Sequence, residues 1–185
     1  MTAGSRLSLF AAPSGGGKTT VALDMLDNQA NGAEVFGHTT NKLTYLVLLQ
    51  DRGMRALRRT LKRLRIDPEQ LPYRLIGYGD KIKAITEALE ACDPMPQALF
   101  IEGIDLLEGD SGKGHNVESL LTRLHRIADH YHVAIIGSSL GGCPKMKPKD
   151  KYTSQRDRVI GSSVWGRKVE TIITCSERPG KRRMK

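Results

Sequence analysis

A glycine-rich segment near the amino terminus contains the residue types that bind phosphate groups. Gly15, Gly16 and Gly17 precede Lys18 and Thr19, and this stretch matches the end of the pattern G-x-x-x-x-G-K-[ST]. Glycines let backbone N–H groups approach phosphate oxygens, the lysine contacts the β- and γ-phosphates, and the threonine hydroxyl binds Mg²⁺. The sequence therefore predicts a site for a nucleoside triphosphate with its Mg²⁺ ion.

The phosphate-binding residues expected from this pattern run through the whole loop. They are Ala12, Pro13, Ser14, Gly15, Gly16, Gly17, Lys18, Thr19 and Thr20. Ala12 takes the position of the first glycine, where the chain turns out of a strand and a methyl group is tolerated. The guanine-reading pattern N-K-x-D is not found, because Asn41–Thr44 lacks the acid and lies too early. ATP is therefore the expected nucleotide.

The elements that must position this loop alternate along the chain. Apolar runs predict strands at 6–11, 45–49, 73–76, 98–101, 133–137 and 169–175. Amphipathic spacing predicts helices at 18–28, 53–65, 81–92 and 117–131. Strands that alternate with helices imply an α/β fold with a parallel sheet covered on both faces. The 185 residues fit one domain, 1–185, with a basic tail at about 178–185.

The carboxyl-terminal third narrows the class of phosphate-loop protein. Ala134–Ser139, Arg156–Trp165 and Glu170–Cys175 together resemble RecA-like ATPases. The resemblance is greatest to the RepA/DnaB-type hexameric helicase branch and the related small phage and plasmid ATPases of AAA type, and it extends from Arg6 to about Arg183. It implies a RecA-like P-loop NTPase fold, with a mostly parallel twisted sheet between helices, and ATP and Mg²⁺ as cofactors.

The resemblance also implies roles for polar residues at strand ends. The acid that organises Mg²⁺ through a water falls on Glu102, and Asp105 is a second candidate. The position of the water-activating glutamate holds Gln50, which can orient a water but cannot accept its proton. Either Asp51 takes this role, or hydrolysis is slow, or the protein mainly binds ATP.

Further residues implied by the resemblance concern the γ-phosphate and a neighbouring subunit. Ser138 or Ser139 would sense the γ-phosphate from the end of the fourth core strand. Arg178 matches the family's arginine that reaches across a subunit boundary, while the lysine expected two residues earlier is Ser176, with Lys181 as a substitute. A site completed by a neighbour predicts a homo-oligomer, with a ring of six favoured.

Positive charge is concentrated in three segments of a chain whose net charge is +9. Basic and acidic residues number seven and one in 51–65, six and two in 143–158, and five and one in 176–185. Such clusters suit a polyanionic partner, although a solvated helix and a basic tail are the alternative interpretation. The residues expected to contact nucleic acid are Lys145, Lys147, Lys149, Lys151, Arg156 and Arg158. The alternation of these lysines in an extended loop predicts sequence-independent binding, with single-stranded DNA favoured.

These observations favour an ATP-binding and ATP-hydrolysing RecA-like motor domain that acts on nucleic acid, either helicase-like or as an accessory protein in replication or recombination. Two alternatives stay open: a non-hydrolysing ATP-binding switch or helicase accessory protein, and a small-molecule kinase that uses the same loop. The sequence has no long apolar run and no secretory signal, so a cytoplasmic protein without a membrane contact is expected. A zinc site is not expected from the three widely spaced cysteines, Cys92, Cys143 and Cys175.

Overall fold

The computed structural model describes residues 7–12, 15–50, 54–69, 71–76, 80–108, 114–140 and 168–174. Within them a six-stranded sheet has the order β3-β2-β4-β5-β1-β6, and every neighbouring pair of strands is parallel. The strands are β1 (Leu7–Ala12), β2 (Tyr45–Gln50), β3 (Tyr73–Ile76), β4 (Ala98–Ile101), β5 (Ala134–Leu140) and β6 (Thr171–Thr174). The helices are α1 (Lys18–Asn31), α2 (Met54–Leu64), α3 (Lys81–Glu90), the 3₁₀ helix η1 (Ile104–Glu108) and α4 (Gly114–Tyr131).

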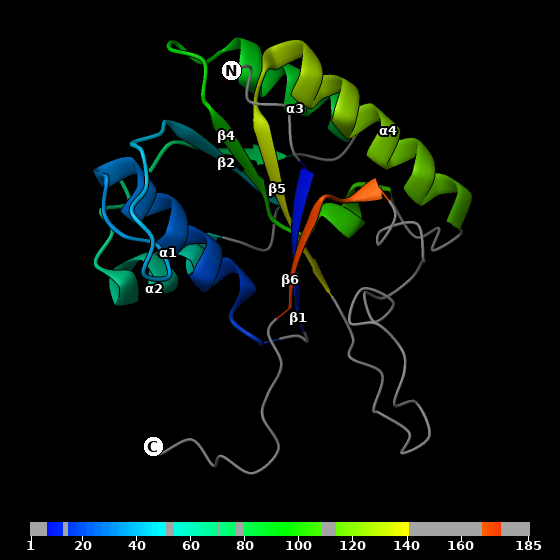
Figure 1. The fold of residues 1–185 in the computed structure, drawn as a ribbon. Coiled ribbons are helices and arrows are strands. Elements are labelled where there is room, and N and C mark those ends of the chain that lie inside the picture. Colours follow the sequence, from blue (N-terminus) through cyan, green and yellow to red (C-terminus); the bar gives the residue numbers. More distant parts are fainter. Residues whose placement is uncertain are drawn as a thin grey trace, which may run out of the picture.

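The helices cover both faces of the sheet, which confirms the α/β architecture expected from the sequence. Figure 1 shows α1 and α2 on one face and α3 and α4 on the other. The strands supply both interfaces because successive side chains point to opposite faces. Leu9 of β1 packs in the cluster under α3 and α4, whereas its neighbour Phe10 packs in the cluster under α1 and α2. Burial on both sides explains why the central strands read as continuous apolar runs.

Helix α1 differs in detail from the helix expected at 18–28. It continues to Asn31 because Gly32, with φ 71°, adopts the left-handed conformation that ends it. The apolar spacing predicts that Val21, Ala22, Met25 and Leu26 face inward. In the structure Leu23 is buried as well, while Val21 and Met25 are only partly buried. The inward face is therefore rotated slightly from the one that the spacing predicts.

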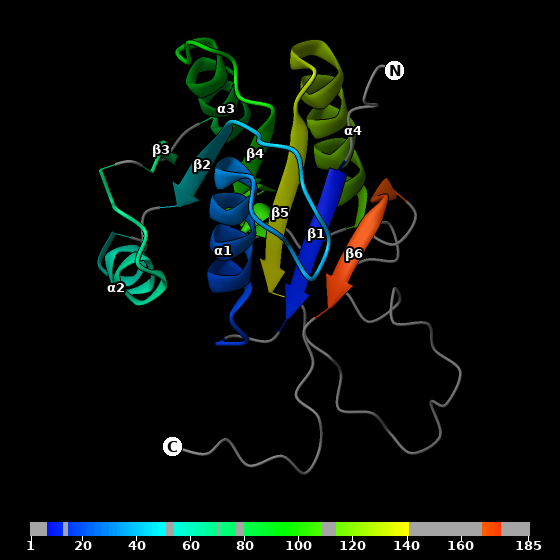
Figure 2. The same ribbon diagram turned by 60° about the vertical axis from the view of Figure 1, so that its left-hand side comes forward.

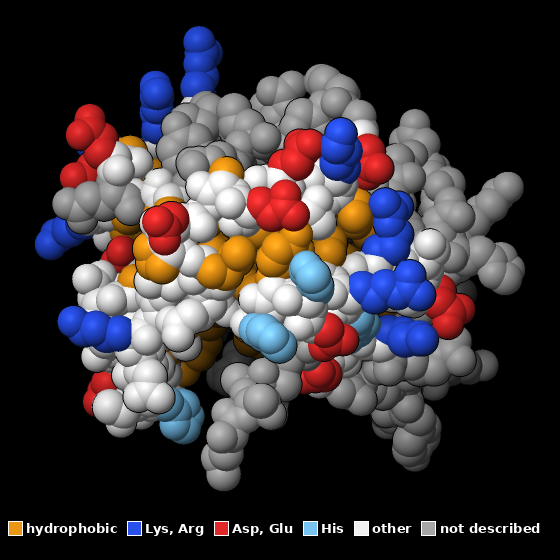
Figure 3. All heavy atoms as spheres, turned by 90° about the horizontal axis from the view of Figure 1, so that it is seen from above, with side chains coloured by type: hydrophobic (Ala, Val, Ile, Leu, Met, Phe, Trp, Pro, Cys, Tyr) orange, Lys and Arg blue, Asp and Glu red, His pale blue; other side chains and the backbone are white. Residues whose placement is uncertain are grey.

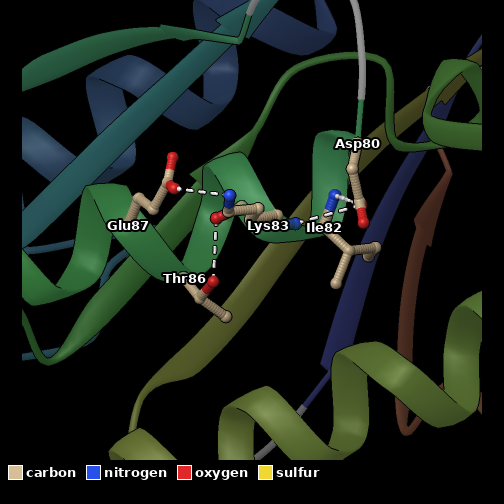
Figure 4. A network of polar contacts seen from close by, with 5 residues as sticks. All are labelled: Asp80, Ile82, Lys83, Thr86 and Glu87. Atoms are coloured by element: carbon tan, nitrogen blue, oxygen red, sulfur yellow. Dashed lines mark hydrogen bonds and ion pairs between the residues drawn. The ribbon is translucent and has the colours of Figure 1, made fainter.

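Helix α3 begins at Lys81 because the preceding residue caps it. The Asp80 carboxylate accepts hydrogen bonds from the backbone N–H groups of Ile82 and Lys83, each at 3.1 Å (Figure 4). One turn later the Lys83 ammonium lies 3.5 Å from the Glu87 carboxylate. A capping carboxylate satisfies N–H groups that have no partner within the helix, which fixes the start of α3.

The two edges of the sheet have different surroundings. In Figure 2 the strands run downward, so that β1 leads into the glycine loop at the lower edge. Figure 3 looks onto the opposite edge, where the strands begin, and acidic and basic side chains are interspersed on this face. None of the helices in the described ranges is long and apolar enough to cross a membrane.

Candidate functional site

The glycine loop between β1 and α1 has a backbone that requires glycine at two positions. Gly15 and Gly17 have φ of 74° and 84°, in the left-handed region, although a Cβ at either would meet nothing within 4 Å. Gly17 is also the N-cap of α1, where it offers no side chain to the first N–H groups, and the first turn contains no acidic residue. These N–H groups and the positive end of the helix dipole favour an anion at this place.

Lys18 lies across this loop. Its Nζ donates a hydrogen bond of 2.8 Å to the carbonyl oxygen of Ala12, the last residue of β1. The ammonium group is thus held between the end of the strand and the start of the helix that enclose the loop. The arrangement suits a cation that contacts bound phosphates, and that contact stays a prediction.

The hydroxyl of Thr19 meets an acid from a strand that is not adjacent to β1. Thr19 Oγ1 donates a hydrogen bond of 2.9 Å to Glu102 Oε1. Glu102 follows β4, and β5 lies between β1 and β4 in the sheet. The Glu102 backbone continues the pairing of β4 with β2, since its N–H donates to Leu48 O at 3.0 Å. Strand order thus brings together two side-chain oxygen atoms that the sequence separates by 83 positions.

The turn that contains Glu102 is held by β5. Gly103, with φ 65°, donates its backbone N–H to Ser138 Oγ at 3.0 Å. Ser138 and Ser139 are 2% and 1% exposed, and they are the buried polar side chains among the described residues. Ser138 therefore positions the turn after β4. A γ-phosphate contact by either serine stays a prediction.

A second contact between β5 and this turn depends on the absence of a side chain. Ile104, which begins η1, is 0% exposed and packs directly over Gly137. A Cβ at Gly137 would lie 2.6 Å from Ile104 Cδ1, closer than carbon atoms approach in folded proteins. Gly137 therefore lets η1, which begins two residues after Glu102, lie directly against the sheet.

Asp105 supplies a second carboxylate near this turn. Its Oδ1 is buried and has no hydrogen-bond partner among the described residues, which is costly for a carboxylate. The part of the chain that the structure describes contains no group of three or more His, Cys, Asp or Glu able to hold a metal. Mg²⁺ usually binds one or two carboxylates, waters and substrate phosphates, so these residues fit a magnesium–nucleotide complex.

Arg63 is a contact of the loop that the sequence did not single out. Its Nη2 donates a hydrogen bond of 2.8 Å to Thr20 Oγ1, in the first turn of α1. Arg63 belongs to α2, which the sequence predicted as a basic amphipathic helix without a role at the loop. No sequence pattern predicts the contact between Arg63 and Thr20, because the contact depends on how α2 packs beside α1.

Several predicted site residues cannot be placed in this way. Gln50 ends β2, and only its backbone is described. The residues outside the described ranges are Pro13, Ser14, Asp51, Lys145, Lys147, Lys149, Lys151, Arg156, Arg158 and Arg178. Their roles stay predictions.

The comparisons with known proteins concern the fold. Neither a protein-family model nor a curated protein sequence matches the chain. Among solved structures, the KaiC-like protein PH0186 from the hyperthermophilic archaeon Pyrococcus horikoshii OT3 is similar, with a TM-score of 0.54 and 18% sequence identity. The match covers 72% of this chain and 60% of that one, so the chain spans less than two thirds of its length. With the strand order and the glycine loop, this likeness shows a RecA-like P-loop fold.

Proposed function

We propose that this chain is an ATP-binding and ATP-hydrolysing RecA-like domain that acts on nucleic acid. The observation that carries the proposal is the hydrogen bond of 2.9 Å between Thr19 and Glu102, beside a glycine loop. A glycine loop alone indicates a phosphate site. A hydroxyl and a carboxylate that converge at its end supply what a magnesium–nucleotide complex needs there, one oxygen ligand of the ion and one acceptor for a water bound to it.

Each described residue of the site has a defined task in this proposal. The N–H groups at the start of α1 and the Lys18 ammonium bind the phosphates, while Thr19 and Glu102 hold the ion, Glu102 through a water. When bound, a Mg²⁺ ion would neutralise charge that develops on the phosphates during transfer. Ser138 and Gly137 keep the Glu102 turn in place. Gln50, at the end of β2, orients the attacking water.

Assembly and the nucleic-acid contact complete the proposal. We assign the contact across a subunit boundary to Arg178, in a homo-oligomer for which a ring of six is favoured. The basic residues within 143–158 contact single-stranded DNA without reading its sequence. Their support is the charge pattern of the sequence and the resemblance to helicase-type ATPases.

The test begins with nucleotide binding measured by calorimetry, with and without Mg²⁺. Thr19→Val and Glu102→Gln should each weaken the Mg²⁺-dependent part of ATP binding about 10- to 100-fold, the usual effect of losing a group that orients a metal. Thr40→Val is the matched control, because the Thr40 hydroxyl donates to Ala33 O at 2.8 Å in the turn after α1. Wild-type affinity in both site variants, or no ATP binding by the wild type, would contradict the proposal.

Turnover is measured next, as phosphate release with and without oligo-dT. The proposal expects free phosphate as the product and faster release with oligo-dT. A phosphorylated acceptor found by mass spectrometry would instead identify a small-molecule kinase. Turnover that is indifferent to oligo-dT at every salt concentration would refute the action on nucleic acid while leaving the ATPase assignment intact.

A second function is favoured by one observation, the amide side chain at the end of β2. With Gln50 in place of a glutamate, the domain would bind ATP as a switch and hydrolyse it very slowly. Gln50→Glu should then raise turnover, since it restores a proton acceptor. An unchanged rate in this variant would count against a lost glutamate as the cause of slow hydrolysis.

A further inference from the structure

Helix α2 has two faces of opposite character. Leu57 and Leu61, 4% and 1% exposed, pack into the cluster shared with α1. At 100° per residue the basic positions of the helix point away from that stripe, whereas Leu64 lies beside it and is partly buried. The exposed basic residues of the helix are Arg55, Arg58, Arg59, Lys62 and Arg63. The helix contains no acidic residue, so its outer face carries a single sign of charge.

This charge is not neutralised within the described part of the chain. The ion pairs found there join Lys83 to Glu87, Arg123 to Asp80, and Lys168 to Glu118, all outside α2. Arg55 and Arg59, and likewise Arg58 and Lys62, stand four residues apart, where like charges on a helix repel. The fold thus holds these like charges close together, and a bound polyanion would reduce the repulsion between them.

The chemistry of the face selects among polyanionic partners. Five basic side chains are spread over about three helical turns, along a helix about 16 Å long, and arginine forks suit phosphate oxygens. A membrane surface is disfavoured because the apolar stripe of α2, Leu57 and Leu61, is buried and cannot enter lipid. A protein partner is disfavoured because the only exposed apolar residue in the described part of α2 is Ala56, which is too small to anchor an interface.

The position of this face links it to the glycine loop. Arg63 reaches Thr20 at 2.8 Å, and Thr20 adjoins Thr19 in the first turn of α1. Figure 2 shows α1 and α2 on the same side of the sheet. A strand bound along α2 would therefore lie beside the phosphate site.

From these observations we propose that the exposed face of α2, formed by Arg55, Arg58, Arg59 and Lys62, binds the phosphate backbone of single-stranded nucleic acid. The inference rests on the proposed action on nucleic acid and adds a second contact surface to the basic residues within 143–158. Contacts to phosphates carry no sequence information, so binding at this face is independent of sequence.

The test uses the full chain and fluorescein-labelled oligo-dT, with binding followed by anisotropy between about 50 and 200 mM salt. The variant combines Arg55→Gln, Arg58→Gln and Lys62→Gln, whose side chains make no ion pair within the described residues. Removing one cation that neutralises a phosphate lowers the slope of log affinity against log salt by about 0.7, so removing three should lower it by about 2. The wild type then loses about 20-fold more affinity than the variant over this range.

The matched control removes three charges from the opposite face of the sheet through Lys83→Gln, Arg123→Gln and Arg126→Gln, all exposed on α3 and α4. It should keep the wild-type slope, and equal melting temperatures of all three proteins show that folding is not the cause of any difference. Equal slopes in the wild type and both variants overturn the role of α2 but leave the proposed function standing. An equal decrease of the slope in both variants also overturns it, because only net charge would matter.

Two further outcomes bear on the inference. If the wild type itself does not bind oligo-dT, the action on nucleic acid fails together with this inference. Vesicles that contain phosphatidylserine serve as the competing polyanion. Loss of vesicle binding in the α2 variant, with an unchanged slope for oligo-dT, would assign the face to a membrane surface and overturn the proposal.

Discussion

Gly137→Ala should disturb both the stability of the fold and the geometry of the site. The added Cβ would lie 2.6 Å from Ile104 Cδ1, 2.9 Å from Cγ2 and 3.0 Å from Cβ. A new rotamer cannot move Ile104 Cβ, so the backbone of η1 must shift. Because Ile104 follows Glu102 by two residues, the carboxylate should move away from Thr19, which it now meets at 2.9 Å.

The magnitude follows from two opposing effects. Overpacking of a buried site costs about 1–3 kcal/mol, and Ile104 is 0% exposed. Replacing glycine by alanine where φ is not left-handed raises the free energy of unfolding by about 0.4–1 kcal/mol, because alanine lowers the conformational entropy of the unfolded chain. We expect a net loss of about 1–2 kcal/mol in the free energy of unfolding, measured by urea titration. Mg²⁺-dependent ATP binding should weaken in parallel.

A double-mutant cycle with Ile104→Ala tests the assigned cause. Ile104→Ala alone should cost about 2–5 kcal/mol, because it leaves a cavity against β5. In the double variant the methyl group introduced at position 137 enters that cavity, so the combined loss should be smaller than the sum by about 0.5–3 kcal/mol. Additive losses, or a Gly137→Ala protein as stable as the wild type, would refute the proposed contact between η1 and β5.

Three further predictions concern single side chains. Asp80→Ala removes the N-cap of α3 and should lower the free energy of unfolding by about 1 kcal/mol, whereas Asp80→Asn, which keeps an accepting oxygen, should retain most of it. Ser138→Ala removes the acceptor of the Gly103 N–H and should cost about 1 kcal/mol in urea titrations, together with weaker Mg²⁺-dependent ATP binding; an effect on stability alone would separate Ser138 from the site. Burial, and secondarily the charge of Asp27, raises the pKa of Tyr45 to about 12. Since the unfolded tyrosine ionises near 10, the wild type should lose stability relative to Tyr45→Phe as the pH rises from about 10 to 12, and parallel stability curves would contradict this.

Much of the fold could be predicted because its signals are local. Four-residue apolar runs such as Ala98–Ile101 mark strands that are covered on both faces, and the spacing of Leu57 and Leu61 marks a helix with one buried side. The irregular segments were missed. These are η1 and the turn in which Val35 pairs with His38, since neither has a repeating apolar pattern.

The candidate site divides in the same way. The sequence by itself determined the phosphate loop, because the conformations of Gly15 and Gly17 and the placement of Lys18 at a helix start follow from residues adjacent in the chain. The sequence identified Glu102 only through the resemblance to RecA-like ATPases. The number of residues between Thr19 and Glu102 did not indicate how close their side chains lie.

Only the tertiary structure decided how the remaining parts meet. The order of strands places β5 between β1 and β4, and this arrangement lets Thr19 reach Glu102. The packing of α2 beside α1 brings Arg63 to Thr20, and the bare backbone of Gly137 admits η1. Such contacts join residues that are far apart in the chain. They depend on how whole elements pack against one another, and local sequence patterns do not encode this.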